Sequence, residues 1–213
     1  MSTRHYKSAS EVLNSEWPIQ VRNQIVPVVN RAYKLTSILF QETEWLDWQV
    51  GINIKGYLKN IAVEHELMKL VDRWESNYSY DIEKNEVENY SYLKINTNYS
   101  STTISQTKSI GAIPRKANFR SNYSISNQLS IEFEEVIIVP SEKYYFIITH
   151  GGETDIPEFI NIGLPEPYTR GWIVRNNLLS EPYYYEISQE EKIDKQDLVS
   201  LKDHINNVKK NEE

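Results

Sequence analysis

The stretch from 129 to 149, LSIEFEEVIIVPSEKYYFIIT, constrains the fold more than any other part of the chain. Two β-rich apolar runs, 136–139 and 144–148, meet across the short break 140–142, a pattern typical of an antiparallel hairpin. Nearly unbroken apolar runs are typical of strands covered on both faces, so we expect this hairpin at the centre of a sheet. A second layer must then cover that sheet.

Helical periodicity dominates the N-terminal part, and we predict a helical region over 14–76. Apolar residues recur at helical spacing between Ile25 and Leu39, but Pro27 removes a backbone hydrogen bond there, so we expect a kink or a break. The clearest helix spans 57–74, and its wide apolar face is the best candidate for covering the hairpin.

An antiparallel β region is predicted over 90–187, after a polar and acidic linker over 77–89. Candidate strands lie near 92–99, 102–106, 119–125, 159–162, 172–174 and 183–187. A C-terminal helix is expected over 188–208, and its start is indicated either by capping-box spacing from Ser188 or by Asp194 as N-cap. The ends 1–13 and 209–213 are expected to be flexible. The predicted class is therefore α+β. We expect a helical N-terminal half packed on an antiparallel β-sheet, with a C-terminal helix, in one integrated domain.

The composition restricts the classes of function. The chain has 23 basic and 30 acidic residues, a net charge of -7 that disfavours nucleic-acid or membrane binding on total charge alone. Cysteine is absent, which excludes disulfides, thiolate zinc sites and cysteine nucleophiles. The N-terminus has no apolar signal segment and no run is long enough to span a bilayer, so we expect a cytoplasmic protein. The 15 tyrosines and only 7 glycines suggest an AT-rich genome, such as that of a low-GC bacterium or its phage.

The acidic residues are missing from one long segment. Between Glu88 and Glu132 the chain has no Asp or Glu but five cations, so this segment could form a positive surface with aromatic stacking platforms. The nucleic-acid-binding candidates are Lys108, Arg115, Lys116, Arg120, Phe119 and Tyr123. Arg170 and Arg175 could extend this surface if the fold brings them there. The alternative explanation is a strand region rich in Ser and Thr, where Asp and Glu are disfavoured in any case.

Signatures of catalysis are weak throughout. The chain has no glycine-rich phosphate loop and no serine-nucleophile motif, and His65 lacks the second histidine of a zinc-protease helix because Lys69 stands there. His150, Glu153 and Asp155 share a predicted loop after a buried strand, which makes them weak candidates for a metal or acid/base site. We expect no cofactor and lean against an enzyme, with a metal-dependent hydrolase or nuclease as one alternative.

Two apolar features indicate a protein interface. Trp45 and Trp48 lie three residues apart among acidic neighbours, and aromatic anchors dominate interfaces. Leu198, Leu201 and Ile205 form a narrow stripe on the predicted C-terminal helix. The leading hypothesis is a non-catalytic regulatory protein whose partner is another protein or a second copy. Nucleic-acid binding through 89–131 is the main alternative, and packing against the sheet is the alternative role for the tryptophans.

Overall fold

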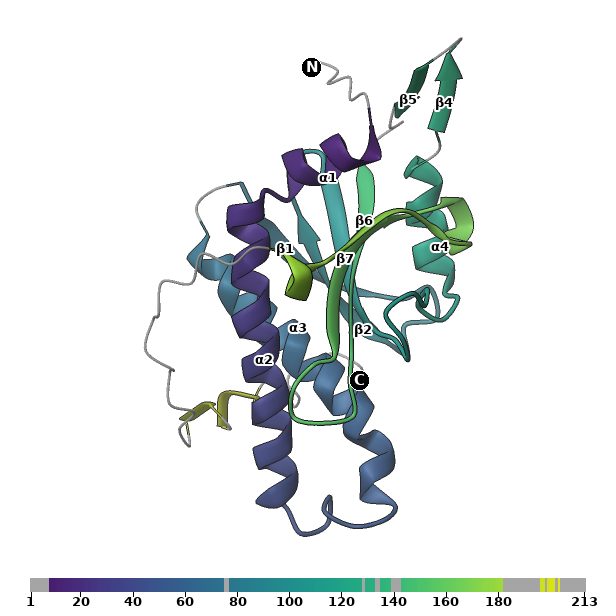
Figure 1. Cartoon of the computed structure of the whole chain (residues 1–213). Helices are drawn as coiled ribbons and strands as arrows, with labels where there is room; N and C mark the ends of the chain where they lie inside the picture. Colours follow the sequence, from purple (N-terminus) through teal and green to yellow (C-terminus); the bar gives the residue numbers. More distant parts are fainter. Residues whose placement is uncertain are drawn as a thin grey trace.

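The chain folds into helices packed against a curved sheet, in the computed structural model described here (Figure 1). The structure describes residues 8–74, 77–127, 129–132, 135–138, 143–181, 196–197, 199–201 and 203, with the backbone alone for 129–132 and 135–138. Its class is α+β, with helices of the N-terminal half packed on a six-stranded, mostly antiparallel sheet and a short C-terminal helix, as predicted.

Three helices form the N-terminal half: α1 (Ala9–Glu16), α2 (Ile19–Gln41) and α3 (Lys55–Arg73). The first begins inside the predicted flexible end, because the side chain of Ser8 accepts a hydrogen bond from the Glu11 N–H and caps it. The expected break at Pro27 is absent, since α2 continues through it. Its neighbours Ile25, Val26, Val28 and Val29 are buried, and this packing outweighs the local cost of proline.

The main sheet has six strands in the order β1-β2-β3-β6-β7-β8. Their bounds are β1 Ser79–Lys84, β2 Ser91–Asn96, β3 Ser100–Gln106, β6 Tyr144–Gly151, β7 Phe159–Pro165 and β8 Trp172–Asn177. The central pair β3–β6 is parallel and the other pairs are antiparallel. The predicted linker over 77–89 was therefore wrong in part, because it contains β1, which pairs with β2 along its whole length.

The predicted central hairpin was also wrong. Strand β5 (Glu135–Ile138) pairs with β4 (Leu129–Glu132) in a separate two-stranded sheet, while β6 enters the main sheet between β3 and β7. The fully apolar run of β6 is central, as its composition indicated, and every residue of β6 is buried. Its partners, however, come from elsewhere in the chain.

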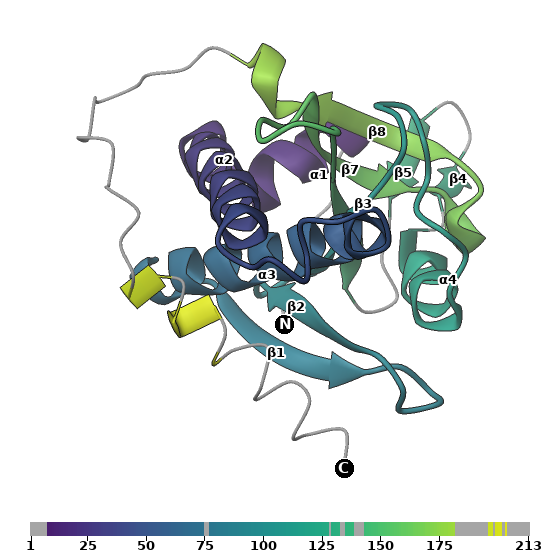
Figure 2. The ribbon, with the colours of Figure 1, turned by 90° about the horizontal axis from the view of Figure 1, so that it is seen from below.

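Residues predicted as a strand over 119–125 instead form α4 (Asn118–Ser124), followed by the 3₁₀ turn η2 (Ile125–Asn127). Asn127 fastens this segment to the sheet: its amide nitrogen donates to the carbonyl oxygens of Tyr145 and Pro165, and its Oδ1 accepts from the Tyr145 N–H. Seen from below, α2 and α3 lie on the inner side of the curved sheet and α4 lies on the other side (Figure 2).

Two apolar clusters hold the layers together. The larger contains side chains of α1, α2, α3 and the main sheet, with Phe146 and Ile148 among its fully buried members. The smaller lies at the far end of the α2–α3 pair. It consists of Leu35, Leu39, Phe40 and Leu46, with Ile38 and Leu58 packed against it.

The C-terminal helical residues pack on α2 and α3. Arg31 of α2 forms ion pairs with Glu66 of α3 and with Asp197, at 3.0 and 2.6 Å. Leu201 is buried in the larger cluster. The predicted strand 183–187 and the helix start at 188–195 lie outside the described residues. Two further 3₁₀ turns, η3 (Pro167–Thr169) and η4 (Leu178–Ser180), flank β8.

Candidate functional site

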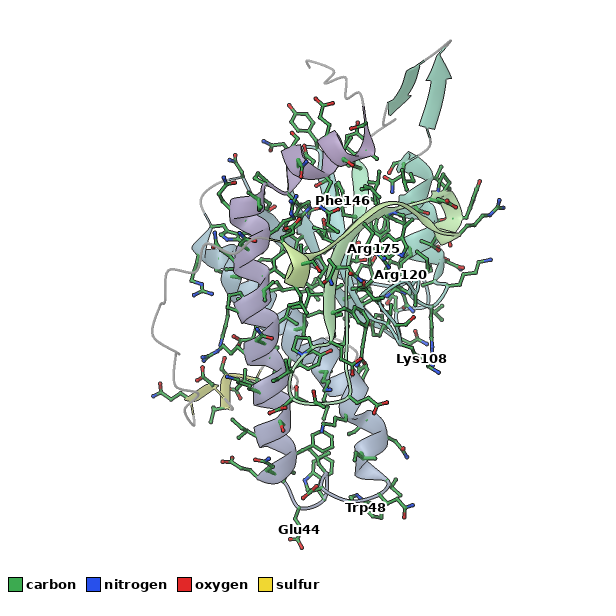
Figure 3. All side chains as sticks on the ribbon, in the orientation of Figure 1. Glu44, Trp48, Lys108, Arg120, Phe146 and Arg175 are labelled. Carbon is green, nitrogen blue, oxygen red and sulfur yellow. The ribbon has the colours of Figure 1, made fainter. Side chains whose placement is uncertain are left out.

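Three of the five cations of the acid-free segment converge on one cleft, whereas Lys94 forms an ion pair with Glu83. Arg115 and Lys116 are exposed on the connection between β3 and α4, and Arg120 follows on α4 with only 8% of its surface exposed. All three line a cleft of about 530 Å³. Lys108 is exposed on the same connection but does not belong to the lining (Figure 3).

Four separate parts of the chain build the walls of this cleft. They are the first turns of α3 with Tyr57 and Asn60, the β1–β2 turn with Glu86 and Tyr90, the end of β3 with Ser105 and Gln106, and the segment 115–120. The main sheet brings them together because β3 lies beside β2 and because α3 packs across both strands. The volume lies within the range of roughly 300–1,000 Å³ that is usual for small-molecule sites.

Arg120 is a buried cation without a carboxylate partner in the described part of the chain. Its Nη1 donates to the Arg115 carbonyl oxygen at 3.1 Å, and its Nη2 lies 3.4 Å from the Ser105 hydroxyl. The Nε atom is buried without a hydrogen-bond partner among the described residues. The guanidinium group lies 4.7 Å from the centre of the Phe119 ring, a cation–π contact.

A chain of buried polar groups runs from the floor of the cleft into the core. Asn60 donates to Glu64 Oε1 at 2.9 Å, and its own Oδ1 lies 3.3 Å from His150 Nε2. The other ring nitrogen of His150, Nδ1, lies 2.9 Å from the Tyr33 hydroxyl. These bonds connect α3, β6 and α2 through polar groups that would otherwise be unsatisfied in the interior.

Burial favours the uncharged forms of Glu64 and His150 in this chain. It raises the pKa of the Glu64 carboxyl to about 8, against the opposing effects of Asn60, the Leu93 backbone and Arg120. It lowers the pKa of His150 to about 3, and the nearby Lys59 ammonium acts in the same direction. Because burial favours the neutral form of Glu64, this carboxyl is a poor counter-charge for Arg120, and no ion pair of Arg120 is present among the described residues.

The aromatic candidates of the acid-free segment are engaged within the fold. Phe119 stacks on Tyr92 with ring centres 4.1 Å apart. Tyr123 and Tyr92 both donate hydrogen bonds to Glu83. Phe119 and Tyr123 thus attach α4 to the sheet. Tyr57 is the exposed ring in the cleft lining, and it belongs to the helix whose apolar face was expected to cover the sheet.

A second hollow extends the positive surface around α4. Its volume is about 450 Å³, and its lining includes Lys116, Tyr168 and Arg170. Arg170 and Lys116 therefore face a common space, as the sequence left open. Arg175 of β8 donates to the Ile110 carbonyl oxygen on the connection that carries Lys108.

The weak catalytic candidates do not come together. The prediction that His150 lies in a loop was wrong, because it lies in β6 and is completely buried. Glu153 and Asp155, in contrast, are exposed. Lys59 instead holds the following loop, since its ammonium donates to the carbonyl oxygens of Gly152 and Thr154 at 2.7 Å each. Among the described residues, no group of three His, Asp or Glu side chains is placed to hold a metal ion.

Among the described residues, the loop between α2 and α3 carries the largest group of exposed apolar side chains that lie close together in sequence. Trp45 is 69% exposed and Trp48 57% exposed, in contrast to Leu46 between them, which is buried in the smaller cluster. The loop lies at the end of the helical pair, where Trp48 and Glu44 project away from the body (Figure 3). Packing of these tryptophans on the sheet is therefore excluded.

The C-terminal stripe has a different outcome. Leu201 is 2% exposed and belongs to the core of this chain, so it does not offer a free surface. Leu198 and Ile205 lie outside the described residues.

Comparison with known proteins gives no family. No protein-family model, curated protein or solved structure matches the chain. None of the helices in the described ranges combines the length and apolar character needed to cross a bilayer.

Proposed function

We propose that this chain is a non-catalytic interaction protein that docks a partner protein through the α2–α3 loop. The exposure of Trp45 and Trp48 carries this proposal, because tryptophan is usually well buried and is strongly enriched among the residues that dominate binding energy. Val50, Ile52 and Ile54 are exposed beside them. Such a concentration of apolar side chains in one loop is typical of an interaction surface.

The charges of the loop indicate the chemistry of the partner. Between Lys34 and Lys55 the chain has no Lys, Arg or His, but it has Glu42, Glu44 and Asp47. An apolar groove bordered by Lys or Arg side chains complements this surface. An anionic membrane surface would repel the same three carboxylates, so a protein is the better occupant.

The test compares the wild-type chain with a Trp45→Ser/Trp48→Ser variant. Partners are captured from lysate of the source cells with and without nuclease treatment, and the partner that depends on the tryptophans is purified and titrated calorimetrically. Loss of the two side chains is expected to weaken its affinity at least about 30-fold, since a single hot-spot residue already contributes about 2 kcal/mol or more. Both tryptophans are exposed, so the free energy of unfolding should change by less than about 0.5 kcal/mol.

A matched control is Ile156→Ser, because Ile156 is 60% exposed on the β6–β7 loop, away from the tryptophans in sequence. This variant should bind the partner as the wild type does. The proposal is wrong if the tryptophan variant binds within about twofold of the wild type. It is also wrong if the captured species disappears on nuclease treatment, or if the variant instead dissociates a dimer of this chain.

A further inference from the structure

We propose that the cleft lined by Tyr57, Arg115, Lys116 and Arg120 binds a phosphorylated nucleoside. The ligand is either a free nucleoside monophosphate or the 5′-terminal nucleotide of a single strand, which share this chemistry. This cleft lacks Trp45 and Trp48 in its lining, although it begins just after their loop, at Gly56 and Tyr57 of α3. The phosphate of the ligand lies against Arg120, and its nucleobase lies against Tyr57.

The buried guanidinium group is the first step of the argument. A buried cation costs several kcal/mol unless an anion or a full set of hydrogen bonds compensates it. Arg120 has two acceptors, the Arg115 carbonyl oxygen and Ser105, but its Nε has no partner among the described residues. An oxyanion in the cleft would supply the missing negative charge and could accept from the Nη groups, since a planar guanidinium group matches phosphate geometry.

The carboxyl groups near the cleft do not perform this role. Glu64 is the neighbouring buried acid, and its burial favours the neutral form at pH 7. Glu86 lines the cleft, but it accepts hydrogen bonds from the side-chain amides of Asn118 and Asn122. Among the described residues, the lining thus combines three cations with one engaged carboxylate, an arrangement that favours an anion.

The residues of α3 and β3 in the cleft lining indicate which group carries the anion. Tyr57 lines the cleft with 55% of its surface exposed, and tyrosine is a side chain on which nucleobases commonly stack. The side-chain amide of Gln106 adds polar groups suited to the edge of a base. The chain lacks a glycine-rich phosphate loop. Side chains, not backbone N–H groups, therefore hold the phosphate.

The experiment is calorimetric titration of the full chain with each of the four nucleoside 5′-monophosphates. The parent nucleosides, inorganic phosphate and a 5′-phosphorylated ten-nucleotide strand serve as the other arms. We expect at least one monophosphate to bind with a Kd below about 100 μM, and its nucleoside to bind at least about tenfold more weakly. A further tenfold gain for the strand identifies a strand end as the source, and no gain identifies the free nucleotide.

Three variants locate the binding. Arg120→Met should lower the affinity at least about 30-fold, and Arg115→Ser/Lys116→Ser should lower it about tenfold and reduce its dependence on salt. Lys108→Ser is the matched control, because Lys108 is an exposed cation of the same connection outside the cleft, and it should bind within twofold of the wild type.

Thermal unfolding of the ligand-free Arg120→Met variant separates a binding role from a structural role. An uncompensated buried cation destabilises the empty protein, so its removal should leave Tm unchanged or raise it. A Tm lowered by more than about 4 °C would assign Arg120 to the fold and overturn the proposal. It is equally overturned if no monophosphate binds below about 1 mM, or if Lys108→Ser weakens binding as much as the double rim variant.

Discussion

At the scale of single residues, the interior is unusual for the polar chain Tyr33–His150–Asn60–Glu64. A histidine and a glutamate that are both buried could form an ion pair, but Asn60 separates them, and burial favours the neutral form of each. The chain therefore satisfies polar groups with hydrogen bonds between neutral partners, which avoids the cost of burying two charges.

Replacement of Glu64 by Gln tests this protonation state. The pKa of Glu64 is raised from 4.5 to about 8, so between these values the folded chain keeps a proton that the unfolded chain releases. The wild type therefore loses stability as pH rises from 4.5 to 8, whereas the glutamine does not titrate. The free energy of unfolding of Glu64→Gln should equal that of the wild type near pH 4.5 and exceed it by up to about 3 kcal/mol at pH 7.

Urea unfolding of both proteins at pH 4.5, 7 and 8.5 measures this difference. Glutamine retains an acceptor for the Asn60 amide, so the comparison isolates the charge. Parallel pH profiles for the two proteins would show that Glu64 is ionised in the folded state.

At the scale of elements, the sequence pattern predicted those whose apolar faces are regular. The helix α3, the strands β2 and β3 and the buried run of β6 were all expected close to their bounds. Periodicity reports which residues of an element are buried, but not which element lies beside it. For this reason β6 was recognised as central while its partners were assigned wrongly: β3 pairs with it in parallel across a long connection.

Two other errors have local causes. The segment 119–125 contains Phe119, Tyr123 and Ile125, residue types that favour strands, yet the two rings are four residues apart and share one face of α4. That spacing was a helical signal available in the sequence. Pro27 predicted a break because its effect was judged from the backbone alone, without the buried neighbours that hold α2 together.

Only the cations of the candidate cleft could be predicted from the sequence. The missing acids drew attention to Arg115, Lys116 and Arg120, which the structure brings to a common space. Tyr57 and Glu64 carried no signal in the sequence, because their relation to these cations depends on how α3 packs across the sheet. Burial of Arg120 was likewise unforeseeable, since its segment was expected to be a strand.

The C-terminal helical segment provides a prediction at this scale. Leu201 lies in the larger apolar cluster, so Leu201→Ser removes a buried side chain and places a hydroxyl in the core. We expect a loss of about 2–5 kcal/mol in the free energy of unfolding, measured in urea, at every protein concentration. Val199→Ser is the control, because Val199 is 54% exposed, and it should change stability by less than about 0.5 kcal/mol. A stripe reserved for a partner would instead give a monomer of unchanged stability.

At the scale of the whole molecule, the two apolar clusters divide the stability of the fold. The larger cluster joins the helices to the sheet, whereas Leu35, Leu39, Phe40 and Leu46 hold only the end of the helical pair. A small, separate cluster supports a unit that opens locally without unfolding the rest. The tryptophan loop belongs to this unit, so its shape depends on Leu46 and its neighbours.

Hydrogen exchange of a Leu46→Ala variant measures this division. Loss of the buried side chain should cost about 2–5 kcal/mol locally, so amides of the loop and of the adjoining turn of α2 should exchange at least about 30-fold faster. Amides of β3 and β6, which open only on global unfolding, should keep the wild-type rate. The partner affinity should fall although Trp45 and Trp48 are both present, because a loop that must be ordered on binding pays an entropic cost. Faster exchange of β6 in parallel with the loop would instead show that the two clusters open as one unit, and would place the support of the tryptophans in the main core.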